Sequence, residues 1–170
     1  MAKNSSQALI GRIGQLFLWS PGGYDTRKPQ PFIVSPNDYQ PALNVLGTKV
    51  TVLASSAATQ GYEITIQQGD EGMGPPLHSH DWDESFYVLK GRIEFSYDNK
   101  TVMCLPGTLV HVPAGTVHGF RYGAGGGEMF ELTGQGSRAT QMFTAISKEV
   151  PPDIPKALEV LKQNGVTVAT

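Results

Sequence analysis

Residues 72–91 read GMGPPLHSHDWDESFYVLKG, and this stretch decides the fold. His78 and His80 are two residues apart, so on an extended chain both imidazoles point the same way. Glu84 begins the strand-like run that follows and can add a carboxylate oxygen. Two imidazoles and a carboxylate suit divalent iron, manganese, cobalt, nickel, copper or zinc. The stretch therefore predicts strands that carry a site for one divalent transition-metal ion.

A second stretch, residues 107–122, reads GTLVHVPAGTVHGFRY. The Pro-Ala-Gly-Thr segment at 113–116 is a turn signal, and His118 opens the strand that follows it. If this hairpin pairs beside the first stretch, His118 points toward the other two imidazoles. His111 lies on the opposite face from Val110 and Val112, so we expect it at the surface or in a subunit contact.

The rest of the chain favours short strands separated by turns. Twenty glycines and twelve prolines are spread along the chain instead of gathering in a linker. A series of strands without intervening helices argues for an antiparallel barrel or sandwich. The glycines at 125–127 read as a hairpin loop. The predicted strands lie around 50–53, 62–67, 85–90, 92–97, 100–104, 109–112, 119–122, 129–133 and 139–145.

The chain reads as one domain with three segments. Residues 1–43 form an arm with one or two short strands, 44–146 the barrel, and 147–170 a helix and tail that pack on the barrel. Asp153 is the expected N-cap of the helix, and Gly165 ends it in a left-handed conformation. The apolar residues of the helix repeat at i, i+3, i+4 and i+7, namely Ile154, Ala157, Leu158 and Leu161.

Alternation extends the inward face beyond the ligands. If Glu84 and His118 face inward, so do the residues at i+2 and i+4, which are Phe86, Val88, Phe120 and Tyr122. These four side chains either line an apolar substrate pocket or fill the barrel core. Cys104 is expected to be a small buried hydrophobe. Asp83 is either a solvated loop acid or an acceptor that orients a ligand imidazole.

Charge and composition exclude several classes of protein. Thirteen Lys and Arg residues against fifteen Asp and Glu residues leave no basic cluster for nucleic acid. No apolar run is long enough to cross a bilayer, and Arg12 interrupts any signal-peptide core. Cys104 is the only cysteine, so no intramolecular disulfide can form and a cytoplasmic location is expected.

The two stretches resemble the paired motifs of the cupin superfamily, Gly-x5-His-x-His-x3-Glu-x6-Gly and Gly-x5-Pro-x-Gly-x2-His-x3-Asn. Every fixed position is met except the last, where Tyr122 stands in place of Asn. The resemblance implies an all-β fold, a small antiparallel jelly-roll barrel with a C-terminal helix. It also implies metal ligation by His78, His80, Glu84 and His118. Segments 44–47, 50–53, 74–78 and 84–89 further resemble quercetin 2,3-dioxygenase-like monocupins.

Three kinds of function follow from this resemblance. The leading one is a metal-dependent dioxygenase for a small phenolic, flavonol-like or enolisable molecule, with dioxygen as co-substrate and Glu84 as base. The second is an oxygen-independent lyase, isomerase or cyclase that uses the same metal as a Lewis acid. The third is a non-enzymatic barrel that binds a small ligand. The resemblance also implies a homodimer. The arm, with its exposed-looking Leu16, Phe17 and Trp19, is a candidate contact element.

Overall fold

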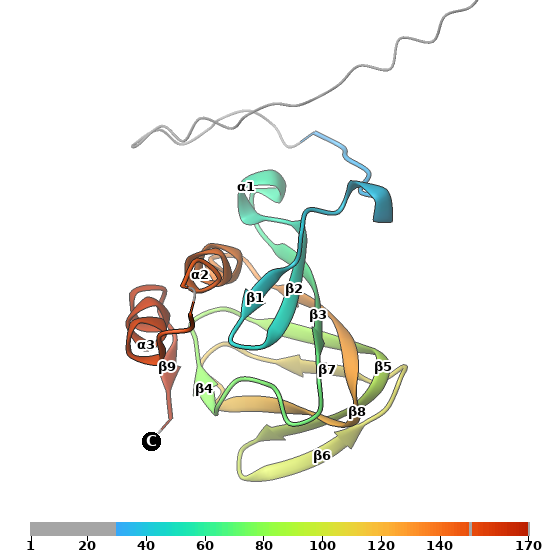
Figure 1. The fold of residues 1–170 in the computed structure, drawn as a ribbon, viewed down its shortest axis with the longest axis vertical. Coiled ribbons are helices and arrows are strands. Elements are labelled where there is room, and N and C mark those ends of the chain that lie inside the picture. Colours follow the sequence, from blue (N-terminus) through green and yellow to red (C-terminus); the bar gives the residue numbers. More distant parts are fainter. Residues whose placement is uncertain (1–29, 150, 170) are drawn as a thin grey trace, which may run out of the picture.

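The structure is a computed structural model that describes residues 30–149 and 151–169 (Figure 1). The predicted strand in the apolar run at 15–19, with its contact residues, lies outside the described residues. No described helix is long and apolar enough to cross a membrane. The elements in chain order are η1 (Pro36–Asp38), β1 (Leu43–Val45), β2 (Thr48–Ala54), α1 (Ser56–Thr59), β3 (Glu63–Gly69), β4 (His78–Ser79), β5 (Glu84–Tyr97), β6 (Lys100–Cys104), β7 (Leu109–Val112), β8 (His118–Thr133), α2 (Ala139–Ile146), α3 (Ile154–Gln163) and β9 (Thr167–Val168).

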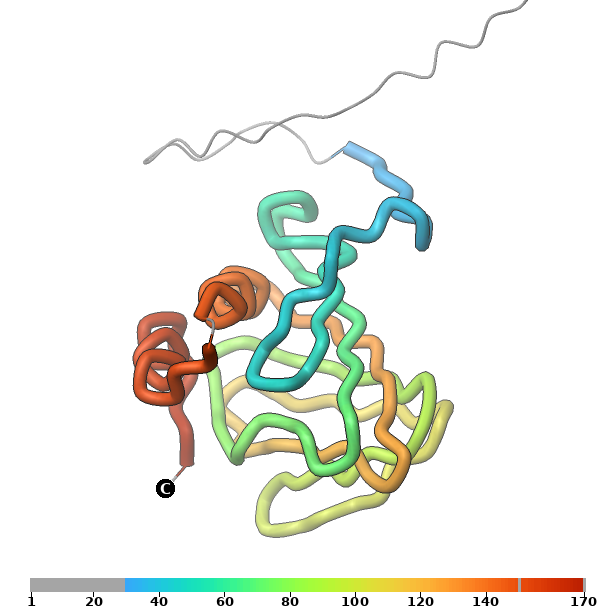
Figure 2. Tube along the Cα trace, in the orientation of Figure 1, coloured from blue at the N-terminus to red at the C-terminus, as the bar shows by residue number. Residues whose placement is uncertain are grey.

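One antiparallel sheet curls into a barrel, as the sequence predicts (Figures 1 and 2). The long strands β5 and β8 pair along their whole length, from Glu84 opposite Thr133 to Tyr97 opposite His118. One half of this ladder continues into β7 on one side and into β3, β2 and β1 on the other. The other half continues into β6 and into β4 and β9. The two halves face each other across the barrel interior.

Glycines allow the long strands to bend between the two halves. The register of β5 against β8 shifts between Gly91 and Ile93, where Tyr122 and Gly127 mark the two sides of a bulge in β8. Gly91 has a φ of +76°, and a Cβ there would lie 2.1 Å from the carbonyl oxygen of Gly126. Only glycine, which has no Cβ, allows the two backbones to come this close at a positive φ. The predicted hairpin loop at 125–127 is therefore wrong, because these residues belong to β8 and form its bend.

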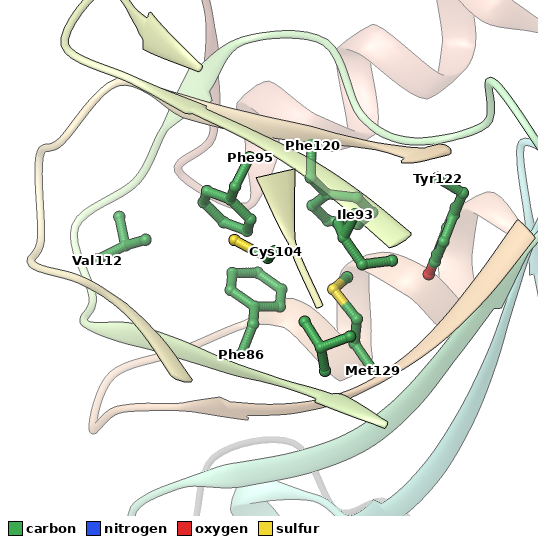
Figure 3. Close-up of a cluster of buried hydrophobic side chains, with 9 residues drawn as sticks. Phe86, Ile93, Phe95, Cys104, Val112, Phe120, Tyr122 and Met129 are labelled. Atoms are coloured by element: carbon green, nitrogen blue, oxygen red, sulfur yellow. The ribbon is translucent and has the colours of Figure 1, made fainter. Parts of the chain in front are cut away.

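The barrel interior holds an aromatic core (Figure 3). Phe86, Phe95 and Phe120 pack with ring centroids 5.1–6.0 Å apart. The four side chains predicted to face inward do so, and each is less than 5% exposed: Phe86, Val88, Phe120 and Tyr122. Cys104 is also buried, as predicted, and burial raises the pKa of its thiol.

The C-terminal region contains one helix more than expected. The strand predicted at 139–145 is wrong, because these residues lie in α2. Their buried positions Ala139, Met142 and Ile146 follow the helical spacing of three and four residues. The buried Glu63 carboxylate stabilises the start of α2 by accepting hydrogen bonds from the Thr140 backbone N–H (3.0 Å) and the Ser137 hydroxyl (2.8 Å).

The predicted helix α3 is present, with part of its apolar face turned outward. Asp153 caps it by accepting a hydrogen bond from the Lys156 N–H, and Gly165 follows it with a φ of +81°. Ala157 is buried, but Ile154 and Leu158 are exposed. α2 and α3 lie side by side on one flank of the barrel, next to β9 and β4 (Figure 1).

The strands β7, β5, β8 and β3 carry apolar side chains on their outer face. Leu109 lies opposite Tyr87, Tyr87 opposite Phe130, and Phe130 opposite Ile66. Leu109 is 65% exposed and Tyr87 43% exposed. An exposed apolar patch of this kind is typical of an interaction surface.

We expect the homodimer, which stays a prediction, to use this outer face. Lys90 and Glu128 at its edge pair with each other at 3.3 Å, so two copies can meet there without unpaired charge. Leu109→Asp should therefore convert a dimer into a monomer, measured by size-exclusion chromatography with light scattering. Ile154→Asp, at an exposed position on α3, is the control and should leave the mass unchanged. A Leu109→Asp protein that stays dimeric would rule this face out.

Candidate metal centre

The structure brings the three predicted histidine ligands together at one end of the barrel. His78 lies on β4 and pairs directly with His118 on β8 and with Val168 on β9. One ring nitrogen from each of His78, His80 and His118 lies within 4.8 Å of the others, so the three could hold one metal ion. His80 and His118 are buried and His78 is half-buried.

Each of the three imidazoles is held by a backbone carbonyl. The Nδ1 atoms of His78, His80 and His118 each lie 2.9 Å from a carbonyl oxygen, those of Pro76, Trp82 and Thr116 respectively. A carbonyl only accepts, so Nδ1 carries a hydrogen, and in the neutral form of each ring the lone pair lies on Nε2. Backbone contacts of this kind fix the tautomer and orientation of metal-binding histidines.

Glu84 faces two of the three Nε2 atoms. Its Oε2 lies 3.1 Å from Nε2 of His80 and 3.0 Å from Nε2 of His118. When the two rings are neutral, their lone pairs and those of the carboxylate repel one another unless a positive charge lies between them. The three-histidine set therefore fits a divalent cation, which would also offset the Glu84 charge beside His80 and His118. Glu84, the fourth predicted ligand, is not part of the group of ring nitrogens that could share one ion. Nitrogen and oxygen donors alone do not select one metal among those predicted.

The ionisation of these groups follows from burial and from their mutual contacts. Burial lowers the pKa of His78 to about 4, with His118 adding to the shift, so this imidazole is neutral at pH 7. Burial alone would raise the pKa of Glu84, but hydrogen bonds with His118 and His80 outweigh it and hold this pKa below its usual range. Burial opposes the charge on His118, yet the contact with Glu84 raises the pKa of His118. The negatively charged Glu84 thus stabilises a positive charge next to it, such as the proton on His118.

Trp82 supports His80 in two ways. Its carbonyl contacts Nδ1 of His80, and its indole stacks on the imidazole with ring centroids 4.3 Å apart and planes 4° apart. The Arg138 guanidinium carbon lies 5.7 Å from the indole centroid. Arg138 also donates to the Asn164 carbonyl at 2.9 Å and pairs with Asp81 at 3.3 Å. These contacts connect a candidate ligand to both C-terminal helices.

Glu131 is a second carboxyl group at the site, and the sequence reading missed it. It is buried on β8 and accepts a hydrogen bond from the Thr65 hydroxyl. It also forms a side-chain hydrogen bond with Glu84. Burial and the Glu84 charge raise the pKa of Glu131 well above its usual value, so it is the protonated member of the pair. Its inward position could have been found from alternation, because Met129, Glu131 and Thr133 share one face of a predicted strand.

A cavity of about 130 Å³ opens beside these groups. Phe86 and Phe120 line it, together with His78, His80 and Glu84. Val88 and Tyr122, which were also predicted as pocket residues, pack in the core instead of on the cavity wall. The Tyr122 hydroxyl has no hydrogen-bond partner among the described residues.

The remaining polar residues singled out from the sequence lie outside the cavity. His111 is exposed, as expected, and its Nδ1 lies 2.9 Å from the Ser85 hydroxyl. Asp83 is exposed and accepts a hydrogen bond from the Ala114 N–H at 2.9 Å. Asp83 therefore joins the loops of the two motifs, and the carbonyls named above orient the imidazoles in its place.

We predict that His80→Ala and His118→Ala abolish metal binding, because each removes a buried lone pair from the ligand set. After equilibrium dialysis against Co²⁺, elemental analysis should fall from about one ion per chain to near zero. His111→Ala is the matched control and should keep the full metal content. Normal metal content in both ligand variants would exclude a centre at this position.

We also predict that Trp82→Leu weakens metal binding by about 10- to 100-fold, the usual cost of losing a contact that orients a ligand. The variant keeps the backbone carbonyl but loses the ring that stacks on His80. Trp82→Phe retains a stacking ring and should stay close to wild type. Calorimetric titration of folded protein with Co²⁺ measures the difference, and equal affinity in the leucine variant would contradict the role of the stack.

The sequence is similar to a known protein family and to a known enzyme. The Cupin_2 family model, described as a cupin domain, matches residues 62–130, which contain all four predicted ligands. Quercetin 2,3-dioxygenase of Bacillus subtilis is 36% identical over 73 residues. That match covers 42% of this chain but 22% of the enzyme, so the chain spans only part of its length.

Solved structures share the fold. An RmlC-like cupin from Shewanella frigidimarina superposes with a TM-score of 0.58 at 17% identity, covering 66% of this chain and 96% of that chain. The polyketide cyclase RemF from Streptomyces resistomycificus gives a TM-score of 0.54 at 21% identity, covering 62% and 80% respectively. At such identities the likeness concerns the fold alone. Residues 62–130 thus match the Cupin_2 model, and the chain shares its fold with these solved structures.

Proposed function

We propose that this protein is a metal-dependent dioxygenase for a small organic molecule with a phenolic or enolisable hydroxyl group. One observation carries the proposal: three imidazole Nε2 atoms and the Glu84 carboxylate converge beside an apolar cavity. The partial match to quercetin 2,3-dioxygenase supports oxygen chemistry at such a centre.

The protein side chains divide the work. His78, His80 and His118 hold the ion as neutral ligands, and Glu84 adds a negative charge. A divalent ion held by these residues would supply Lewis acidity toward a substrate hydroxyl and toward dioxygen. Glu84 then accepts the hydroxyl proton and leaves the substrate as an anion. Both atoms of dioxygen enter the product.

Glu84 suits this role only with an acidified substrate. The pKa of Glu84 is held below its usual range, so the group is ionised at neutral pH but is a weak base. It can take a proton from a hydroxyl whose own pKa has fallen on binding the cation. An enol or a phenol meets this condition better than an aliphatic alcohol, which is why the proposal names those substrates.

The Glu84–Glu131 pair supports a second candidate, an oxygen-independent isomerase, lyase or cyclase. Contacts lower the pKa of Glu84, while burial and the Glu84 charge raise the pKa of Glu131. Two neighbouring carboxyl groups with opposite shifts can serve as base and acid in one proton transfer. The cyclase RemF shares the fold, which makes such chemistry compatible with a barrel of this kind.

Oxygen uptake by the reconstituted protein tests the proposal. Samples loaded with Fe²⁺, Mn²⁺, Co²⁺ or Ni²⁺ are mixed with a panel of phenols, flavonols and 1,3-diketones. We expect substrate-dependent oxygen uptake with at least one metal. Glu84→Gln should lower kcat by about 10²- to 10⁴-fold, the usual contribution of a general base.

The same samples separate the candidates. His111→Ala, a change on the outer surface, should react like wild type. Turnover that continues under strict anaerobiosis would reject the dioxygenase in favour of the second candidate. Binding without turnover under either atmosphere would leave only the ligand-binding barrel.

A further inference from the structure

The lining of the cavity beside the candidate metal centre has a polar and an apolar part. The polar lining residues are Thr48, Gln67, His78, His80, Glu84 and Glu131, all from the barrel. The apolar part combines barrel residues such as Val50, Phe86 and Phe120 with Ala139, Met142, Phe143 and Ile146 of α2. A molecule that fills the cavity therefore meets oxygen and nitrogen atoms beside the candidate metal centre and hydrocarbon elsewhere.

The volume limits the size of that molecule. The cavity measures about 130 Å³. Pockets for drug-sized ligands measure about 300–1,000 Å³, whereas an engineered cavity of about 150 Å³ in another protein binds benzene. The space next to the histidines therefore suits a single substituted ring or a short chain. A flavonol, with three rings, is too large for it.

The charges on the walls limit its chemistry further. None of the described residues that line the cavity is a lysine or an arginine. The ionisable groups among the described lining residues, apart from His78 and His80, are the carboxyl groups of Glu84 and Glu131. A carboxylate or phosphate placed away from the metal would face hydrocarbon with no cation to pair with, and burying an unpaired charge is costly. The walls therefore favour a ligand that is uncharged away from its metal-binding end.

We propose that the site takes uncharged molecules of single-ring size, with their oxygen atoms at one end and hydrocarbon at the other. This rests on the metal centre of the proposed function, but not on the use of dioxygen. Size is set by the α2 side chains, above all Met142, which is 7% exposed and lines the cavity. Charge selection comes from the absence of a cation along the described part of the wall.

Anaerobic binding to Co²⁺-loaded protein tests the proposal on the wild-type chain. The probes are 4-methylcatechol, protocatechuate, which carries a carboxylate in place of the methyl group, and quercetin. Each is titrated while the visible spectrum of the cobalt is recorded. We expect 4-methylcatechol to bind at least about tenfold more tightly than protocatechuate, because of the unpaired charge. Quercetin should not perturb the spectrum. Equal or tighter binding of protocatechuate or of quercetin would overturn the proposal.

Two variants on α2 locate the size limit. Met142→Trp places a bulky indole ring in the cavity. It should weaken 4-methylcatechol binding at least about tenfold, with metal content unchanged. Gln141→Trp, one residue away and exposed, is the control and should bind like wild type. Unchanged binding in a folded, cobalt-loaded Met142→Trp protein would also overturn the proposal. If that variant does not fold, the wild-type titrations decide alone.

The two proposals fail separately. Selective binding of 4-methylcatechol without oxygen uptake would contradict the dioxygenase and leave the size and charge selection standing. Oxygen uptake with quercetin or protocatechuate as the preferred substrate would contradict the selection and support the dioxygenase. A wild-type protein that binds no cobalt would contradict both proposals.

Discussion

The rest of the site depends on the hydrogen bonds that fix the three imidazole rings. Each Nδ1 lies 2.9 Å from a carbonyl two residues away, so the chain that carries a histidine also orients it. The consequence is a buried group of lone pairs that face a carboxylate. Such a group is unfavourable unless positive charge is present, so the three-histidine cluster could hold a metal ion at this point.

The sequence predicted the histidine cluster and most of the strands, because both depend on local spacing. His78 and His80 share a face through strand alternation, and Asp153 and Gly165 mark the limits of α3 as expected. Long-range features were beyond this reasoning. The bend of β8 at Gly126 depends on Gly91, and the start of α2 depends on Glu63, which is far away in the sequence. Neither contact leaves a pattern in neighbouring residues.

Glu131 shows why polarity misleads on these strands. Usually the apolar residues of a half-buried strand face the core. On β8 the polar Glu131 and Thr133 are buried, while Leu132 between them is exposed. On β3, Thr65 and Gln67 are likewise buried. Among these residues, Gln67 and Glu131 line the cavity beside the candidate metal centre, so the reversed pattern lies on the side of the sheet that faces it.

The short strand β9 has a consequence for how an ion would leave. His78 pairs with Val168, and the Ala169 N–H donates to the Leu77 carbonyl at 2.8 Å. A strand of two residues that pairs with one neighbour opens more readily than the long ladder of β5 and β8. When β9 detaches, β4 loses one of its two neighbouring strands, while His80 and His118 keep their own supports. A small local opening at β9 would therefore free His78 first. The rate at which a bound ion exchanges would then depend on how often β9 separates from β4.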